Sequence, residues 1–385
     1  MSEKCHHFDT RAIHAGQSAD PATGAVMTPI YATSTYVQDS PGKHKGYDYS
    51  RAGNPTRNAY ERCVADLEGG RAGFAFASGM AASATVLELL DSGSHIVAID
   101  DLYGGSFRLF ENVRRRSAGL EFTFVPILDA DSLRAALRPE TRMIWVESPT
   151  NPLLRIVDLA MVADVGRKAG ALTVIDNTFA SPWVQRPLEH GFDIVVHSAT
   201  KYLNGHSDVV GGVVVVGGND ELIEKLGFLQ KAVGGIASPF DSYLALRGLK
   251  TLPLRMARHC ENALAISMWL EQHQAIEKVS YPGLPSHSNH AVAAKQMNGF
   301  GGMVSAEIRG GLDAARRFLE RCSVFALAES LGGVESLVEH PGIMTHSSIP
   351  PDIRAAIGIS DGLVRLSVGV EHVDDLIADL AQALA

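Results

Sequence analysis

The sequence predicts an α/β fold with a large, mostly parallel seven-stranded sheet and a smaller C-terminal α+β domain. From about residue 56, short apolar runs rich in β-branched residues alternate with amphipathic stretches. Runs that are apolar throughout are typical of strands buried on both faces, and strands that alternate with helices predict a parallel sheet with crossover helices. The chain has 385 residues, more than one hydrophobic core usually spans, so we expect two domains.

Seven segments carry the strand pattern of the large domain. They are residues 72–78, 95–100, 121–127, 143–148, 171–176, 193–198 and 211–217. Between them, residues 81–90, 106–117, 131–137 and 159–169 have apolar residues at helical spacing.

The two ends of the chain differ from this pattern. Residues 1–55 show little periodicity and are rich in Gly, Pro, Ser and Tyr. A segment this long without regular structure is unusual unless it packs on something or carries function. After a long helical region at about 242–273, strand-like residues 301–308 and 363–370 alternate with helices at 312–322 and 373–384. The predicted parts are an N-terminal segment (1–55), a large domain (56–250) and a C-terminal α+β domain (251–385).

Composition and charge narrow the class of protein. The formal net charge is -9 without a basic stripe, so a nucleic-acid partner is not expected. No apolar run reaches the roughly 18 residues of a membrane span and the first residues lack the apolar core of a signal peptide, so we expect a cytoplasmic protein without a membrane partner. The four cysteines lie far apart with no C-x-x-C pair, which predicts neither a disulfide framework nor a metal site.

Polar residues follow three of the predicted strands. Ligands of open parallel sheets bind beyond the carboxyl ends of the strands. The turn Ser78-Gly79-Met80 follows the first strand and opens a helix, whose free N–H groups suit a phosphate. Asp176 ends a second strand and Lys201 follows a third. Taken singly, neither feature identifies a site. A turn of this kind is common between a strand and a helix, and an aspartate at the end of a strand is equally often a helix cap.

Together these features match the requirements of pyridoxal phosphate (PLP). The phosphate requires a helix N-terminus and hydroxyl groups, the pyridine nitrogen a carboxylate, and the aldehyde a deprotonated lysine. Asp176 would keep the pyridine nitrogen protonated, and Lys201 would form the imine. The phosphate would be held by Gly79, Met80, Ser198 and Thr200.

Two further residues complete the expected site. Tyr103 follows the second strand and is placed to stack on the ring, while Asn151, in the sequence ESPTNP, is placed to donate to the phenolic oxygen. The sequence therefore predicts a PLP enzyme that acts on amino acids.

The same residues lie in motifs that resemble the Cys/Met-metabolism PLP enzymes, a branch of the fold type I (aspartate-aminotransferase-like) superfamily. Matching segments include YDYSRAGNPTR (47–57), DDLYGGSFRLF (100–110), VIDNTFASP (174–182), HSATKYLNGHSD (197–208) and LAESLGGVESL (327–337). The resemblance runs from about residue 9 to the C-terminus, and HSATKYLNGHSD is highly specific.

The resemblance implies a role for each cofactor residue. Lys201 would be the Schiff-base lysine and proton shuttle, Asp176 the partner of the pyridinium, and Tyr103 a stacking and acid/base group. The implied cofactor-binding set is Lys201, Gly79, Met80, Tyr103, Asp176, Thr178, Ser198, Thr200, Tyr49 and Arg51.

Arg365 would clamp the substrate α-carboxylate through a two-pronged guanidinium contact. The other residues implied at the substrate are Asn151, Ser330, Glu147, Asp48 and Glu329. Of these, the acids Asp48 and Glu329 are placed to recognise a distal amino group, as expected for a small-molecule substrate that is an amino acid at both ends.

Tyr49 and Arg51 would reach the phosphate of the PLP in a neighbouring subunit. This role explains why the N-terminal segment lacks structure within its own chain. The resemblance implies a homotetramer, a dimer of catalytic dimers.

The implied reaction is that of a cystathionine γ-lyase: L-cystathionine to L-cysteine, 2-oxobutanoate and ammonia, with hydrogen sulfide from cysteine as a side product. The run Ser330-Leu331-Gly332-Gly333 resembles the γ-lyase and γ-synthase form rather than that of bacterial β-lyases. Cystathionine γ-synthase, which joins an O-acylhomoserine such as O-succinylhomoserine to cysteine, is the rival, because Asp48 stands where many γ-lyases have glutamate. Methionine γ-lyase is disfavoured by Gly105, where those enzymes carry a cysteine, and cystathionine β-lyase is also less expected.

Overall fold

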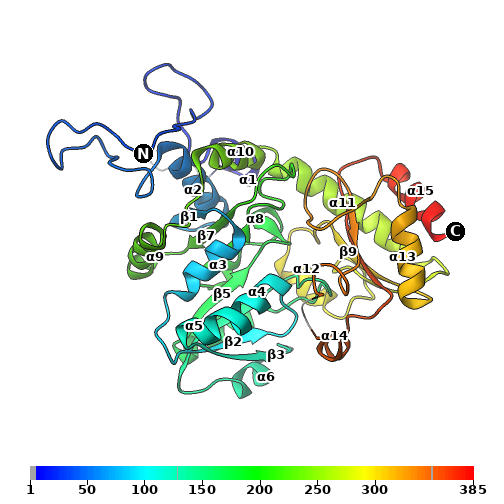
Figure 1. Ribbon diagram of the computed structural model, residues 1–385. Coiled ribbons are helices and arrows are strands. Elements are labelled where there is room, and N and C mark those ends of the chain that lie inside the picture. The colour runs from blue at the N-terminus through cyan, green and yellow to red at the C-terminus, as the bar shows by residue number, and fades with distance from the viewer. Residues whose placement is uncertain (1–5, 128, 348–349) are drawn as a thin grey trace.

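The computed structural model describes residues 6–127, 129–347 and 350–385. Within these residues the chain forms two β-sheets, each with its own helices (Figure 1). The larger sheet has seven strands in the order β1-β7-β6-β5-β4-β2-β3, and the smaller has five in the order β10-β11-β12-β9-β8. Each sheet contributes to a separate hydrophobic core.

The larger sheet confirms the seven predicted strands, with ends that differ by at most two residues. Its strands are β1 (Ala72–Phe76), β2 (His95–Ile99), β3 (Glu121–Val125), β4 (Thr141–Glu147), β5 (Leu172–Asp176), β6 (Ile194–Ser198) and β7 (Gly212–Val216). The sheet is parallel except for β7, which runs antiparallel to β1 and β6. Every residue of β2 and β7 is buried, which explains why these segments are apolar throughout.

Helices cover the larger sheet on both faces (Figure 1). They are α2 (Pro55–Glu68), α3 (Gly79–Leu87), α4 (Gly104–Arg108), the π-helical turn η1 (Leu109–Arg114), α5 (Arg115–Ala118), α6 (Ala130–Ala135), α7 (Leu159–Ala169), α8 (Ser181–Val184), the 3₁₀ turn η2 (Pro187–His190), α9 (Asp220–Val233) and α10 (Pro239–Leu249). The predicted helix at 106–117 is divided among α4, η1 and α5, and α2 and α9 were not predicted. No helix in the described part of the chain is long and apolar enough to cross a membrane.

The N-terminal segment departs from the prediction in one place. Residues 8–14 form the helix α1 (Phe8–His14), whose Ala12 is fully buried and which packs on α2. The prediction that residues 1–55 lack regular structure is therefore wrong there. Residues 15–53 contain isolated bridges but no helix, and part of this segment extends away from the body of the protein (Figure 1).

The long helical region predicted at about 242–273 is confirmed, and it consists of two helices. Lys250 and Thr251 separate α10 from α11 (Leu252–Glu271). Pro253 lies in the first turn of α11. Proline lacks an N–H group and clashes with the preceding turn, so it starts a helix but does not continue one.

The smaller sheet confirms the predicted α+β character of the C-terminal part. It comprises β8 (Ile276–Ser280), β9 (Met303–Ile308), β10 (Ala326–Leu327), β11 (Leu337–Glu339) and β12 (Leu363–Ser367), with helices α12 (His290–Gln296), α13 (Gly311–Arg321), α14 (Pro351–Ile357) and α15 (Val373–Leu384). The predicted strands match β9 and β12, whereas β8, β10 and β11 were not foreseen.

The helix α11 contributes to both hydrophobic cores. Its Leu252 and Met256 belong to the core of the larger sheet, and its Ala263 and Ile266 belong to that of the smaller one. The boundaries after residues 55 and 250 stay predictions.

Candidate active site

A cavity of about 290 Å³ opens where β4, β5 and β6 end. Most of the predicted site residues line it: Gly79, Met80, Tyr103, Glu147, Asn151, Asp176, Thr178, Ser198, Thr200, Lys201, Glu329, Ser330 and Arg365. Glu147, Asp176 and Ser198 are the last residues of their strands, so the sheet topology itself brings them together. The opposite wall comes from the smaller sheet and its loops.

The start of α3 forms one wall of the cavity. Ser78 caps this helix, and its side chain accepts a hydrogen bond from the Ala81 N–H at 3.0 Å. Gly79 lies against Ser198, because a Cβ placed on Gly79 would come within 3.0 Å of the Ser198 Cβ. The first N–H groups of a helix lack partners within the helix and attract anions. The backbone at Gly79 and Met80 therefore suits a phosphate.

Lys201 lies in the turn after β6, and its Nζ donates to Ser330 Oγ at 2.7 Å. Burial and, second to it, the positive charge of Arg365 lower the pKa of Lys201 to about 8. A usable fraction of the amine is therefore neutral near physiological pH, which a nucleophile or a general base requires.

Asp176 is held by its neighbour Thr178, whose N–H and Oγ1 donate to Asp176 Oδ1 at 3.0 and 2.5 Å. Burial raises the pKa of Asp176, and the Thr178 hydrogen bonds oppose that rise. In the described part of the chain, no lysine or arginine forms an ion pair with this carboxylate. A positively charged group that enters the cavity would supply the missing partner.

Tyr103 lies at the start of α4, and its N–H donates to Glu147 Oε2 at 2.9 Å. Burial and then the charge of Asp176 raise the pKa of Glu147 well above its ordinary value, which favours the protonated carboxyl group. The Tyr103 ring crosses the start of α4 so closely that a Cβ on Gly105 would meet it at 2.4 Å. The glycine at 105 is therefore required by this position of the ring.

Arg365, on β12, forms the centre of the opposite wall and is 2% exposed. Its Nη1 donates to Asn151 Oδ1 at 2.8 Å, and its Nη2 donates to the Ser330 carbonyl at 3.0 Å. Nη1 also pairs with Glu339 Oε1 at 2.9 Å. The predicted substrate residues Arg365, Asn151 and Ser330 thus meet, although they lie far apart in the sequence.

Several residues of the site were not foreseen. The additional lining residues are Ser83, Ser106, Phe179, Val210, Leu331 and Thr345, and Ser78 of the predicted phosphate-binding turn also lines the cavity. Phe179 and Leu331 lie within the motifs VIDNTFASP and LAESLGGVESL, so these motifs contained a usable signal. No signal in the sequence pointed to Glu339, because its contact with Arg365 depends on how β11 pairs with β12.

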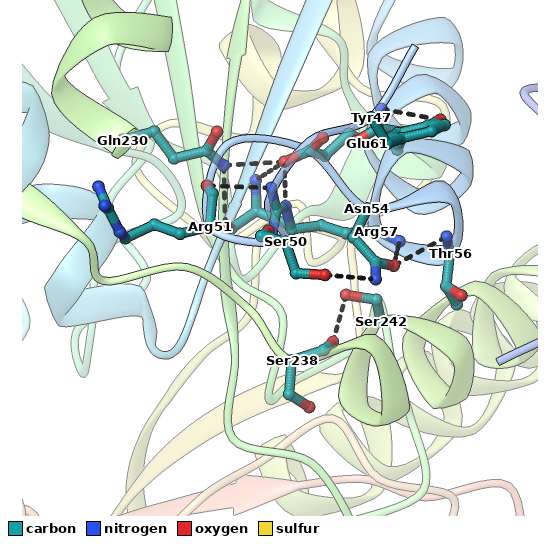
Figure 2. Close-up of polar contacts among 12 residues, drawn as sticks. Tyr47, Ser50, Arg51, Asn54, Thr56, Arg57, Glu61, Gln230, Ser238 and Ser242 are labelled. Atoms are coloured by element: carbon teal, nitrogen blue, oxygen red, sulfur yellow. Dashed lines mark hydrogen bonds and ion pairs between the residues drawn. The ribbon is translucent and has the colours of Figure 1, made fainter. Parts of the chain in front are cut away.

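Three predicted residues, Asp48, Tyr49 and Arg51, do not line the cavity of their own chain. The segment that carries them is attached to α2, where Arg57 Nη1 donates to the Ser50 carbonyl at 2.7 Å. Figure 2 shows that the Arg51 side chain points away from this network. The role of these residues in a neighbouring subunit stays a prediction.

The sequence profile of the Cys/Met metabolism PLP-dependent enzymes matches residues 9–385. The chain belongs to this family. It is 62% identical over 383 residues to cystathionine beta-lyase of Coxiella burnetii, covering 100% of this chain and 99% of the relative. It is 54% identical over 380 residues to cystathionine gamma-lyase of Dictyostelium discoideum, covering 98% of each chain.

A solved structure gives the same relationship in three dimensions. The crystal structure of cystathionine gamma-lyase from Lactobacillus plantarum complexed with L-serine superimposes with a TM-score of 0.96 at 50% identity, covering 98% of each chain. The predicted fold type I architecture and the predicted cofactor are confirmed: the protein is a PLP-dependent enzyme of Cys/Met metabolism.

The donors around the cavity fit PLP. Asp176 is a half-buried carboxylate without an ion-pair partner in the described residues, as the protonated ring nitrogen requires. Lys201 is a half-buried amine with a lowered pKa, and the start of α3 provides free N–H groups beside two hydroxyl residues, Ser198 and Thr200. We propose that these residues hold PLP in the predicted roles, with the Tyr103 ring stacked on it.

Proposed function

We propose that this PLP-dependent enzyme is a carbon–sulfur lyase that converts L-cystathionine to L-cysteine, 2-oxobutanoate and ammonia by α,γ-elimination. The observation that carries the proposal is that Lys201, Arg365 and Glu329 line one cavity. They provide a base, a cation for one carboxylate and an exposed acid for a distal ammonium group. This set suits a substrate that is an amino acid at both ends.

Arg365 is the proposed binding partner of the α-carboxylate. Its Nε is buried and has no hydrogen-bond partner among the described residues. Since Nη2 carries two hydrogens and the Ser330 carbonyl accepts one, Nε and Nη2 leave donors for a two-pronged contact with a carboxylate.

The proposed proton transfers use Lys201 and Tyr103. When bound, PLP supplies an electron sink that stabilises negative charge on the substrate. Lys201 removes the proton from Cα, and its flexible stem then reaches the Cβ proton that γ-elimination also requires. Ser330 Oγ orients the amine. Burial, as the largest cause, raises the pKa of Tyr103, so its hydroxyl stays protonated and serves as the acid for the leaving sulfur.

Elimination at Cβ instead of Cγ is the second candidate. The same three residues would bind cystathionine for that reaction, and the 62% identical relative from Coxiella burnetii is named a cystathionine beta-lyase. The γ-replacement of a cystathionine γ-synthase also remains an alternative, because of Asp48. We propose elimination at Cγ rather than at Cβ because of the run Ser330-Leu331-Gly332-Gly333. We propose a lyase rather than a synthase because the segments FAFASGMAAS (74–83) and DDLYGGSFRLFENVRRR (100–116) resemble those of bacterial lyases.

Product identification tests the proposal. The purified enzyme is given L-cystathionine alone, and the keto acid and the thiol are identified by mass spectrometry. We expect 2-oxobutanoate and cysteine, whereas pyruvate and homocysteine would establish β-elimination. In a second reaction, O-succinylhomoserine and cysteine should give no cystathionine. A Lys201→Ala enzyme is the control for non-enzymatic breakdown.

We also propose that the enzyme is a homotetramer in the cytoplasm. The support for assembly is the N-terminal segment, in which Val26 and Val37 are 88% and 91% exposed and Tyr49 is 46% exposed. Large apolar side chains on a protruding segment favour packing against another chain. Sedimentation analysis of the purified enzyme checks the tetramer.

A further inference from the structure

Glu339 and Arg365 form a buried ion pair behind the cavity. They are directly opposite each other in the antiparallel strands β11 and β12, and Arg365 Nη1 lies 2.9 Å from Glu339 Oε1. The side chains are 2% and 1% exposed. Directly opposed residues of antiparallel strands place their side chains on the same face of the sheet. The pairing of the two strands therefore sets the ion pair.

Glu339 reaches the cavity only through other residues. Arg365 and Thr345 line the cavity, whereas Glu339 does not. Glu339 Oε1 also accepts a hydrogen bond from Thr345 Oγ1 at 2.9 Å, and Glu339 Oε2 is buried without a hydrogen-bond partner in the described residues. Any effect of Glu339 on a bound substrate must therefore act through Arg365, through Thr345 or through its charge.

We infer that Glu339 is a positioning residue that sets how strongly Arg365 holds the substrate α-carboxylate. The inference rests on the proposed role of Arg365 as the carboxylate clamp. Glu339 fixes the guanidinium by accepting from Nη1, so that Nε and Nη2 keep their place. Its negative charge also offsets that of the guanidinium, and the pair is neutral before the substrate binds.

A carboxylate that binds to Arg365 meets the repulsion of Glu339. Two like charges a few ångströms apart in a buried site interact strongly. Glu339 therefore weakens the binding of any amino acid or keto acid that uses the clamp. Substrate and product carboxylates bind equally to such a clamp, so tighter binding would lower KM without raising kcat. Glu339 thus fixes the orientation of the Arg365 guanidinium and keeps the binding of the carboxylate reversible.

The test compares two ligands that differ only by the carboxylate. Glycine and methylamine both carry an amino group, but methylamine lacks the carboxylate, and neither has a side chain that can be eliminated. Their dissociation constants are measured on the PLP-loaded enzyme from the change in its visible spectrum. The ratio of the methylamine constant to the glycine constant reports the contribution of the clamp.

Glu339→Gln removes the charge but keeps an oxygen that accepts from Arg365 and Thr345. We expect the ratio to rise about tenfold, because the repulsion is lost while the geometry is kept. The dissociation constant of methylamine should stay within roughly threefold of that of the unchanged enzyme. A ratio that falls, or that rises by less than roughly threefold, overturns the inference.

Two sets of variants serve as controls. Glu277→Gln removes an exposed carboxylate on β8, away from the cavity lining, and should leave the ratio unchanged. Glu339→Asp and Glu339→Asn form a second matched pair, so the effect of the charge stays measurable if Glu339→Gln does not fold. The ratio should be higher for the Asn variant than for the Asp variant, and equal ratios count against the inference.

Arg365→Ala separates this inference from the proposed function. If Arg365 is the clamp, Arg365→Ala reduces the ratio strongly. If the ratio of the methylamine to the glycine dissociation constant is unchanged in that variant, the proposed role of Arg365 itself is refuted. A reduced ratio in Arg365→Ala together with no change in Glu339→Gln would leave the clamp in place and reject only the role of Glu339.

Discussion

The two sides of the cavity are built in different ways. On the side of the larger sheet, the site residues occur at or just after the ends of β1, β5 and β6, and each lies within a few positions of its strand. On the side of the smaller sheet, Arg365 meets Asn151 across 214 positions of sequence. Lys201 links the two sides through its hydrogen bond to Ser330. The cofactor side is thus built from local turns, and the substrate side from long-range packing.

The two sides also treat charge differently. Asp176 is a half-buried carboxylate that has no ion-pair partner in the described part of the chain and relies on hydrogen bonds from Thr178. Arg365, in contrast, is a buried cation already paired with Glu339. The cofactor side therefore requires a positively charged ligand to complete it, whereas the Arg365–Glu339 pair on the substrate side is neutral before a ligand binds. The predictions below separate the contributions of the two sides.

Removing the lysine that links the two sides should have the largest effect. Lys201→Ala is expected to reduce turnover at least about a thousandfold, because the proposed base is lost, while the fold is retained. Steady-state kinetics and circular dichroism measure the two effects. The matched control is Lys168→Ala, an exposed lysine of α7 that pairs with Asp164. Normal turnover in Lys201→Ala would refute the role of Lys201.

Removing the clamp should have the next largest effect. Arg365→Ala is expected to raise KM for L-cystathionine roughly a hundredfold, since a buried, hydrogen-bonded cation is lost. The free energy of unfolding should also fall by about 3–5 kcal/mol, because Glu339 is left buried and unpaired. Kinetics and urea denaturation test these effects, with the exposed Arg309→Ala as the control. If KM hardly changes, the carboxylate binds elsewhere.

The pH dependence of PLP uptake tests the lowered pKa of Lys201, the residue that links the two sides. The PLP-free protein captures PLP through neutral Lys201, whose pKa is lowered to about 8. Below that pH the amine is mostly protonated, so the uptake rate should rise about tenfold per pH unit and level off above about 8. Stopped-flow absorbance measures the rate, with Nα-acetyl-lysine as the reference amine. A rise that continues beyond about pH 10 contradicts the lowered pKa.

The smallest effect is expected at the mouth of the cavity. Glu329 is exposed, so Glu329→Gln should raise KM for L-cystathionine only about two- to fivefold, as for other solvent-exposed charge pairs. KM for S-ethyl-homocysteine, which keeps the bond between Cγ and sulfur but has no distal ammonium group, should not change. An equal change for both substrates would mean that Glu329 does not recognise the distal group.

The secondary structure was predictable where the signal is local. The seven strands of the larger sheet were found because each is a short apolar run, and the motifs after them identified Gly79, Asp176 and Lys201. The helix α1 was missed because only Ala12 among its residues is fully buried, which leaves a weak periodic pattern. The division between α10 and α11 was missed, although Pro253 is a known start signal.

The sequence by itself determined the fold class, the PLP chemistry and most of the residues that line the cavity. Each of these depends on neighbouring residues: strands from apolar runs, helix starts from capping residues, and the cofactor site from turns after strands. Only the tertiary structure decided how Arg365 is held. Glu339 lies opposite Arg365 because β11 pairs with β12 in one register. That register depends on the packing of side chains from distant parts of the chain, which no local pattern of residues contains.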